Sequence, residues 1–258
     1  MAIGSFLKFK DTSLQSELNL AEEAARAAGK VLKQNFLTDA GITKAAGKDL
    51  KTQADLTAEK IILDILSASP HPRVSEEADA PPELPAKGPC WIVDPLDGTM
   101  NFARGFPLSC VSIALWTDGK PTLGVILDLN GDHLYRGVVG QGAEVDGKPL
   151  QVSAIAEVGQ SVMATGFPTG RSYDSENLAK FISCVKQFKK IRMIGSAALS
   201  LTYVASGVWE IYHEENVFLW DVAAGLALVE AAGGEIAFSP LASNGTFTVT
   251  ASNGRVTL

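Results

Sequence analysis

The stretch PCWIVDPLDGTMNF (residues 89–102) begins with a short apolar run and continues into two aspartates, a proline and a glycine. An apolar run that stops at a proline is typical of a buried strand. Asp94 follows this run directly, and a carboxylate in such a buried or half-buried place needs a counter-charge. Pro95 fixes the chain so that Asp97 can turn back towards Asp94, while Gly98 lets the backbone approach a ligand.

The paired aspartates point to a cation site. Two carboxylates close together repel each other unless a cation lies between them. Oxygen ligands without histidine or thiolate favour a hard cation such as Mg²⁺. An EF-hand loop does not fit, because proline stands second, the second aspartate fourth and glycine fifth. A plain turn built from turn-favouring residues remains the alternative interpretation of the stretch by itself.

Strand and helix patterns surround this stretch. The runs SCVSIALW (109–116), TLGVILDL (122–129) and HLYRGVVG (133–140) are separated by TDGKP and NGD. Because Asp-Gly and Asn-Gly steps between apolar runs are strong hairpin signals, these runs predict an antiparallel meander, and EVDGKPLQV (144–152) predicts one more hairpin. Before them, the spacing predicts helices over 14–36 and 54–66, with a polar hairpin segment, KAAGKDLKTQAD (44–55), in between.

The pattern changes after about residue 155. From there strands and helices alternate: strands over 161–166, 210–214, 234–239 and 246–252, and helices over 175–188, 197–207 and 220–234. The sequence therefore predicts an α+β N-terminal lobe (1–153), with its antiparallel meander packed on helices, followed by an α/β C-terminal lobe (154–258).

Composition narrows the class of protein. The 258 residues are 46% apolar with a formal net charge of −7, and no basic tract beyond KQFKK (186–190) indicates nucleic-acid binding. No apolar run approaches the ~18 residues that span a bilayer, and no signal segment begins the chain. We therefore expect a cytoplasmic protein without membrane or nucleic-acid partners. The three cysteines are predicted to be reduced core thiols.

Other catalytic motifs are missing from the sequence. The three histidines match no zinc pattern, and there is no GxSxG elbow, P-loop or GxGxxG loop. Further acidic residues stand in the polar hairpin segment, in RVSEEAD (73–79) and at a predicted helix start. Taken singly, each is most simply a solvated turn, surface or helix-cap residue.

Together, these segments resemble the inositol monophosphatase family of Mg²⁺-dependent, Li⁺-sensitive phosphatases, a superfamily that includes fructose-1,6-bisphosphatase. WIVDPLDGTMNF (91–102) and WDVAAGLALVEAAGG (220–234) look like the family's two signatures. KAAGKDLKTQAD fits its K-x-x-x-x-D-x-x-T-x-x-D segment, and SEEA (75–78) fits its G-E-E-S turn with Ser75 in place of glycine. The resemblance implies a layered αβαβα fold like that of sugar phosphatases, and a homodimer.

The resemblance also implies residue roles. Glu76, Asp94 and the Leu96 carbonyl would bind one Mg²⁺, and Asp94, Asp97 and Asp221 a second, with a third ion on Glu76 and water. Thr99, backed by Asp55 and supported by Glu77, would orient and help deprotonate the attacking water. Substrate contacts would come from Gly98, Thr99, Gly195, Ser196 and Glu214. Lys44 and Asp49 would lie at the mouth of the site in a supporting role.

The substrate implied is a small phosphate monoester. TMNF after DPLDG looks more like the inositol branch than the nucleotide branch, which favours inositol monophosphate or a related polyol or sugar phosphate. Histidinol-phosphate and fructose-1,6-bisphosphate phosphatases are the alternatives among enzymes. A non-catalytic regulatory protein that binds metal and phosphate is the alternative from another class. The short C-terminus and the missing Asp near Phe238 depart from the family pattern.

Overall fold

The computed structural model describes residues 12–36, 42–46, 49–77, 85, 87–167, 172–242 and 245–258. For residues 12–13, 42–46 and 49–51 it describes the backbone alone. None of the helices in this part of the chain combines the length and the apolar character that crossing a bilayer requires.

A seven-stranded sheet holds the stretch with the paired aspartates. Its strands follow in sequence order: β3 (Arg73–Ser75), β4 (Pro89–Asp97), β5 (Cys110–Thr117), β6 (Lys120–Asp128), β7 (Leu134–Val138), β8 (Gly142–Val145) and β9 (Lys148–Pro149). From β4 onward every neighbouring pair is antiparallel, which confirms the predicted meander and final hairpin. The short strand β3, which the sequence did not indicate, pairs parallel with β4.

Two N-terminal helices cover one face of this sheet. They are α1 (Thr12–Asn35) and α2 (Gln53–Leu66), close to the predicted bounds. Their apolar stripes pack against alternate side chains of β4 and β5, among them the fully buried Trp91 and Ile113. Between the helices, β1 (Ile42–Ala46) and β2 (Asp49–Thr52) form the expected hairpin.

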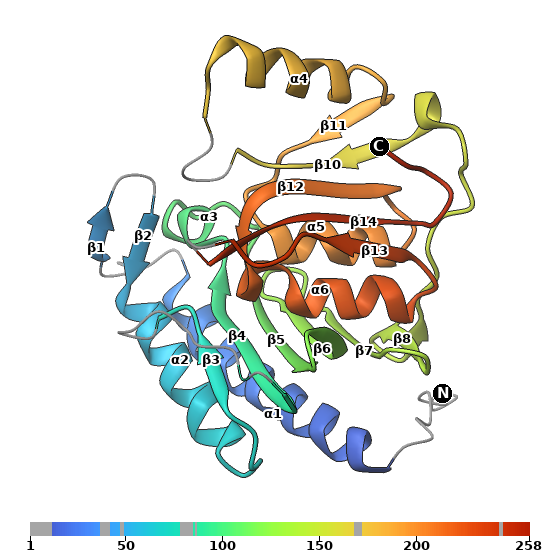
Figure 1. The fold of residues 1–258 in the computed structure, drawn as a ribbon. Helices are drawn as coiled ribbons and strands as arrows, with labels where there is room; N and C mark the ends of the chain where they lie inside the picture. The colour runs from blue at the N-terminus through green and yellow to red at the C-terminus, as the bar shows by residue number, and fades with distance from the viewer. Residues whose placement is uncertain are drawn as a thin grey trace.

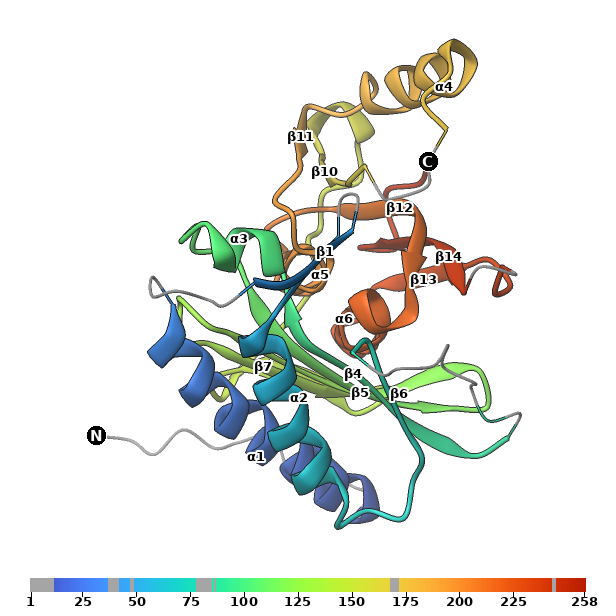
Figure 2. The same cartoon turned by 90° about the vertical axis from the view of Figure 1, so that its left-hand side faces the viewer.

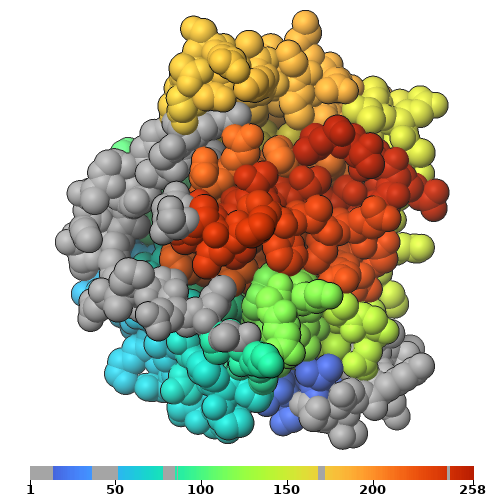
Figure 3. Space-filling model, viewed as in Figure 1, coloured from blue at the N-terminus to red at the C-terminus, as the bar shows by residue number. Residues whose placement is uncertain are grey.

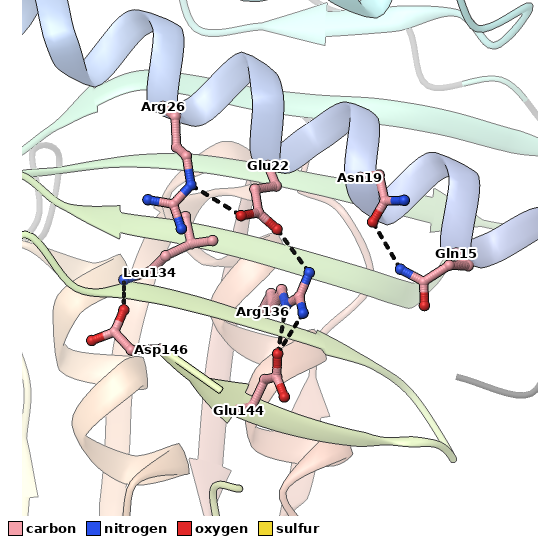
Figure 4. A network of polar contacts seen from close by, with 8 residues as sticks. All are labelled: Gln15, Asn19, Glu22, Arg26, Leu134, Arg136, Glu144 and Asp146. Carbon is pink, nitrogen blue, oxygen red and sulfur yellow. Dashed lines mark hydrogen bonds and ion pairs between the residues drawn. The ribbon is translucent and has the colours of Figure 1, made fainter. Parts of the chain in front are cut away.

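Ion pairs connect α1 to β7 and β8 of the same sheet (Figure 4). Arg136 in β7 lies between two glutamates, 2.7 Å from Glu22 of α1 and 2.6 Å from Glu144 of β8. The Glu144 side chain is only 1% exposed, and the ion pair with Arg136 gives this buried carboxylate a counter-charge. Arg26 contacts Glu22 at 2.9 Å from the next turn of α1. The network ties the first helix to two strands of the meander.

The second face of the seven-stranded sheet is covered by α5 (Ala197–Ala205) and α6 (Leu219–Ala231). Both helices are apolar nearly all round, as expected for helices buried between two layers. They pack on their other side against a five-stranded sheet (Figures 1 and 2).

This second sheet has the strand order β11-β10-β12-β14-β13. Its members are β10 (Val162–Ala164), β11 (Lys190–Arg192), β12 (Ile211–Phe218), β13 (Glu235–Phe238) and β14 (Thr246–Ser252). β10 is parallel to both β11 and β12, whereas β14 is antiparallel to both β12 and β13. The mixed sheet contains the four predicted strands, and β11 is an addition that the sequence did not reveal.

The outer face of the five-stranded sheet carries α4 (Ser175–Val185), capped by Asp174. Val185 of this helix packs with Met163 and Ile211 of the sheet. The layers thus run α1/α2, seven-stranded sheet, α5/α6, five-stranded sheet, α4, which confirms the predicted αβαβα arrangement. In Figure 3 the chain from β10 onward forms the upper part of the molecule as drawn. The proposed lobe boundary between residues 153 and 154 stays a prediction.

Candidate functional site

The site begins where β4 leaves regular pairing with β5. Asp94 pairs with Ser112 and Asp97 with Cys110, and the register shifts between the two aspartates. The irregularity contains Pro95, which lacks the amide hydrogen that a regular ladder would use. Both aspartates are buried, and the Leu96 amide donates to Asp94 Oδ1 at 2.9 Å. The bend predicted from Asp-Pro-Leu-Asp is therefore present.

Gly98 ends the bend in a left-handed backbone conformation, which favours glycine. Its φ is 84°, and a Cβ at this position would lie 2.7 Å from the Leu108 carbonyl oxygen. Any other residue would be strained by its φ and would also clash. The chain then enters the short helix α3 (Thr99–Ala103), which the sequence did not predict as a helix. Gly98 thus places Thr99 at the first turn, next to the aspartates.

The Thr99 hydroxyl contacts two oxygens. Thr99 Oγ1 lies 3.2 Å from Asp55 Oδ1 and 2.9 Å from the Leu96 carbonyl oxygen, and it can donate its single hydrogen to either. Asp55 is itself fixed at the start of α2 by a capping box with Thr52, whose amide donates to Asp55 Oδ2 at 2.6 Å. Burial raises the pKa of Asp55, although the bonds from Thr52 and Thr99 oppose this.

Four carboxylates from three elements influence one another: Glu76 after β3, Asp94 and Asp97 in β4, and Asp221 in the first turn of α6. Burial, followed by the charges of Glu76 and Asp97, raises the pKa of Asp94 and of Asp221 well above the usual range. Because the four groups raise one another's pKa, they form one acidic cluster. A buried cluster of this kind requires protons or a cation.

The members of the cluster differ in their contact with solvent. Asp94 and Asp97 are buried and Asp221 is half-buried, and both Asp97 and Asp221 line a cavity. Burial of the carboxyl group is the largest cause that raises the pKa of Glu76 to about 8, although the residue as a whole is exposed. The charge of the neighbouring Glu77 raises the pKa of Glu76 further, whereas a hydrogen bond with Asp94 opposes the shift. Glu77 itself is buried.

The chemistry of these donors fits a hard divalent cation. The cluster offers carboxylate oxygens and the Leu96 carbonyl, with no histidine or thiolate ligand among the predicted set. Within the described ranges, no three His, Cys, Asp or Glu side chains already form an arrangement that could hold a metal ion. The donor set therefore suits such a cation in kind, and its side chains would have to move closer together to surround one.

Asp97 also connects β4 to the second half of the molecule. Its Oδ2 accepts hydrogen bonds from the Ser196 hydroxyl and from the Ala198 amide (2.9 Å) at the start of α5. The thiol of Cys110 lies 3.7 Å from the same oxygen. Burial raises the pKa of Asp97, and the hydrogen bonds from Ser196, Ala198 and Cys110 oppose this shift because they favour the ionised carboxylate. Sequence reasoning missed this role of Ser196.

A second link crosses the same junction. Asn101 in α3 donates from Nδ2 to the carbonyls of Leu108 and Ile194, each at 2.8 Å. Gly195 follows with a φ of 71°, and a Cβ there would lie 3.1 Å from the Asn101 amide. The amide of Asn101 therefore holds the loop that precedes α5 against α3.

A cavity of about 260 Å³ opens beside Asp97 and Asp221. Its lining residues come from both sides of the junction: Asp97, Thr165, Gly166, Phe167, Gly195, Ser196, Ala197, Ser200, Glu214, Val217 and Asp221. Of the substrate-side residues predicted from the sequence, Gly195, Ser196 and Glu214 line it. The segment 165–167 was missed, and its one sequence signal is its place at the end of the predicted strand over 161–166.

Two predicted residues cannot be placed against the site. Lys44 falls in β1 and Asp49 in β2, but their side chains lie outside the described part of the chain. Their supporting role stays a prediction. Every other predicted residue lies in the carboxylate cluster, beside it, or on the wall of the cavity.

Comparison with known proteins identifies the family of this chain. The family model described as the inositol monophosphatase family matches residues 13–256. An inositol-1-monophosphatase of Synechocystis sp. (strain ATCC 27184 / PCC 6803 / Kazusa) is 36% identical over 255 residues, covering 96% of this chain and 88% of the relative. The Nus factor SuhB of Escherichia coli (strain K12) is 34% identical over 221 residues, covering 84% of this chain and 83% of the relative.

A solved structure has the same fold. The inositol monophosphatase from Anabaena (Nostoc) sp. PCC 7120 superimposes with a TM-score of 0.81 at 36% identity, covering 95% of this chain and 93% of that one. The mixed sheets with paired helices between them match this structure, and the relatives named inositol monophosphatase show that the chain is a phosphatase. The chain belongs to the inositol monophosphatase family.

Proposed function

We propose that the protein is a Mg²⁺-dependent phosphomonoesterase that hydrolyses inositol monophosphate or a related polyol phosphate. One observation carries the proposal: Asp97 and Asp221 of the carboxylate cluster line a cavity whose wall also includes Glu214. A phosphate ester bridging this space would have its phosphoryl group at the cluster and its alcohol in the cavity. The family's metal dependence agrees with the cluster, and Mg²⁺ is the ion that its oxygen donors favour.

Two to three cations would be held by the cluster. Glu76, Asp94 and the Leu96 carbonyl would bind the first, and Asp94, Asp97 and Asp221 the second; a third would rest on Glu76 and water. When bound, such ions neutralise phosphoryl oxygens, lower the pKa of bound water and stabilise the leaving oxygen. Asp97 is held by Ser196 and Ala198, so its orientation is set before any cation arrives.

Thr99 and Asp55 would act on the attacking water. The Thr99 hydroxyl points its hydrogen at Asp55 or at the Leu96 carbonyl, which leaves oxygen lone pairs to accept a hydrogen from water. A proton taken from the water can then pass through Thr99 towards Asp55. Glu77 would support this network, while the Gly98 and Thr99 amides would bind phosphate oxygens.

The cavity favours a leaving group without a second phosphate. None of its described lining residues is Lys or Arg, and Glu214 contributes a negative charge. A second phosphate would be repelled there, which argues against fructose-1,6-bisphosphate and adenosine bisphosphate. Hydroxyl groups can donate to Glu214, as can the ammonium group of histidinol phosphate. Polyol phosphates are thus the first choice and histidinol phosphate the alternative.

Phosphate release tests the proposal directly. The purified chain, freed of metal and then supplied with Mg²⁺, is assayed on inositol-1-phosphate, histidinol phosphate, fructose-1,6-bisphosphate and the adenosine bisphosphate. We expect activity only in the Mg²⁺-supplied state, and the highest kcat/KM on inositol-1-phosphate. Equal release without metal would refute the metal assignment, and a preference for either bisphosphate would refute the substrate class. The resemblance also implies inhibition by Li⁺, which the same assay measures.

A regulatory role beside catalysis is the second candidate, because similar relatives are named Nus factor SuhB. An inactive variant separates the two functions. A cell whose only copy of the gene carries Asp97→Asn keeps a regulatory function but loses a catalytic one. A phenotype equal to deletion of the gene would leave catalysis as the sole function.

We further propose that the protein is a cytoplasmic homodimer. The support is the family resemblance together with exposed apolar side chains near the site, Met100 and Phe106 among them. Light scattering during gel filtration gives the mass in solution. A species of the monomer mass at micromolar concentration would contradict the dimer, and cell fractionation tests the location.

A further inference from the structure

A fully buried tyrosine lies against the carboxylate on the cavity wall. Tyr212 is 1% exposed in β12, between its partners Ala164 of β10 and Ala251 of β14. Its hydroxyl donates to Glu214 Oε2 at 2.9 Å. The two residues are two positions apart on one strand, so their side chains leave on the same face of the sheet. Burial raises the pKa of Tyr212 well above its usual range, so the phenol keeps its hydrogen and can donate it.

A glycine bounds the same carboxylate from another strand. Gly166 follows β10, which is the neighbour of β12 in the sheet (Figure 1). A Cβ at Gly166 would lie 2.3 Å from Glu214 Oε1 and 2.6 Å from Oε2. The carboxylate therefore occupies the volume that any side chain at position 166 would need. Gly166 has no positive φ to explain the glycine, so the close approach of Glu214 is the reason for it.

These contacts fix a side chain that would otherwise sample many rotamers. A free glutamate loses conformational entropy when a ligand orders it, and that loss weakens binding. A glutamate already held by a buried donor on one side and by backbone on the other has lost this freedom on folding. Its orientation towards the cavity is thus set in the absence of substrate.

We propose that Tyr212 is a positioning residue that acts through Glu214, with Gly166 providing the space, and thereby determines the preference for hydroxyl-bearing phosphate esters. The inference rests on the proposed function, since it assigns the alcohol of the substrate to this cavity. Tyr212 does not touch the substrate or the phosphoryl group. Its effect therefore depends on what the alcohol offers to Glu214.

Two substrates separate positioning from general structure. Inositol-1-phosphate carries hydroxyls that can reach Glu214, whereas the nitrophenyl group of 4-nitrophenyl phosphate carries no hydroxyl. In Tyr212→Phe, which keeps the ring and removes the donor, we expect KM for inositol-1-phosphate to rise about three- to tenfold with kcat nearly unchanged. Both constants for 4-nitrophenyl phosphate should stay within about twofold of wild type. An equal loss on both substrates would overturn the inference.

A double variant tests whether Tyr212 acts through Glu214. Glu214→Gln alone should lose the preference for inositol-1-phosphate, and adding Tyr212→Phe should cause no further loss. Multiplicative losses in the double variant would show that Tyr212 acts independently, and would overturn the proposal. Tyr135→Phe is the matched control, because Tyr135 is also buried but lies in β7 of the other sheet. Tyr135→Phe should change neither KM nor kcat for either substrate.

A variant on the other side of the Glu214 carboxylate tests the inference even if Tyr212→Phe does not fold. Gly166→Ala pushes the Glu214 carboxylate away while leaving the buried tyrosine intact, and it should give the same substrate-selective rise in KM. Circular dichroism and thermal unfolding establish that each variant is folded. Unchanged selectivity in folded Gly166→Ala would contradict the inference. A wild-type enzyme that shows no preference for inositol-1-phosphate or histidinol phosphate over 4-nitrophenyl phosphate would instead refute the proposed function, and the inference with it.

Discussion

The end of β4 and the wall of the cavity are built in different ways. At the end of β4, Asp94, Leu96, Asp97, Gly98 and Thr99 follow one another along a single stretch. On the cavity wall, the neighbouring groups come from the end of β10, the start of α5 and β12, three separate elements of the second half of the chain. The first region concerns the phosphoryl group that all substrates share, and the second concerns the alcohol that differs. Changes in the first should affect every substrate, and changes in the second only some.

The largest effect is expected from Asp97→Asn. This change removes a charge from the cluster but keeps the shape and one acceptor oxygen for Ser196 and Ala198. Loss of several kcal/mol of charge stabilisation corresponds to a fall in kcat of about 10³-fold. The fall should be the same on inositol-1-phosphate and on 4-nitrophenyl phosphate. Mg²⁺ titration followed by calorimetry gives the accompanying loss of metal affinity. A substrate-dependent effect would contradict the division between the two regions.

Thr99→Val is expected to rank second. Valine keeps the shape but cannot pass a proton between water and Asp55, and general acid–base steps contribute about 10²-fold or more. We expect kcat to fall by about that factor on both substrates, with KM little changed. Thr99→Ser, which keeps the hydroxyl, is the matched control and should recover most of the activity. An inactive Thr99→Ser would show that packing rather than the hydroxyl matters.

Ser196→Ala affects the junction between the regions. Ser196 donates to Asp97 and accepts from the Leu199 amide at 3.1 Å as the cap of α5. Losing a bond to a charged group should weaken metal binding about tenfold, and losing the cap should cost about 1 kcal/mol of unfolding free energy. Urea unfolding measures the second effect in metal-free protein. An unchanged Mg²⁺ requirement would show that Ala198 alone suffices to hold Asp97.

Phe167→Leu should have the smallest effect. The Phe167 ring lines the cavity. Its centroid lies 4.9 Å from the ring centroid of Phe181 and 5.8 Å from that of Tyr173. Such ring pairs are worth about 0.5–1.5 kcal/mol, so we expect a change in KM of about two- to tenfold that depends on the size of the alcohol. Comparing inositol-1-phosphate with glycerol phosphate measures this. Equal changes for both alcohols would mean that the ring does not contact the substrate.

The same contrast explains what the sequence could reveal. The meander was predictable because Asp-Gly and Asn-Gly turns separate runs of apolar residues, and local turn chemistry sets the pairing. The bend at Asp94–Asp97 was predictable for a similar reason, since proline and glycine act within a few residues. β3 and β11 are each three residues long and have no periodicity to detect. Their strand geometry comes from the neighbours with which they pair.

The cavity wall lay mostly beyond sequence reasoning. Glu214 was found through its distance from Asp221 in the family pattern, but the contacts of Tyr212 and Gly166 depend on two strands meeting in a sheet. The role of Ser196 as a donor to Asp97 joins residues 99 positions apart. Periodicity and local motifs carry no record of such contacts, because they arise only when the layers pack.

The two bonds of Ser196 limit which residues evolution or a library can place at this position. One small group must give a hydrogen to Asp97 and, at the same oxygen, receive one from the amide of Leu199. A hydroxyl group donates and accepts at the same oxygen, whereas an amide does so at two different atoms and an ionised carboxylate cannot donate. Amide and carboxylate side chains also need more room than is available at a residue that is only 4% exposed. In a saturation library selected for activity, we therefore expect position 196 to retain serine and threonine and to reject the rest.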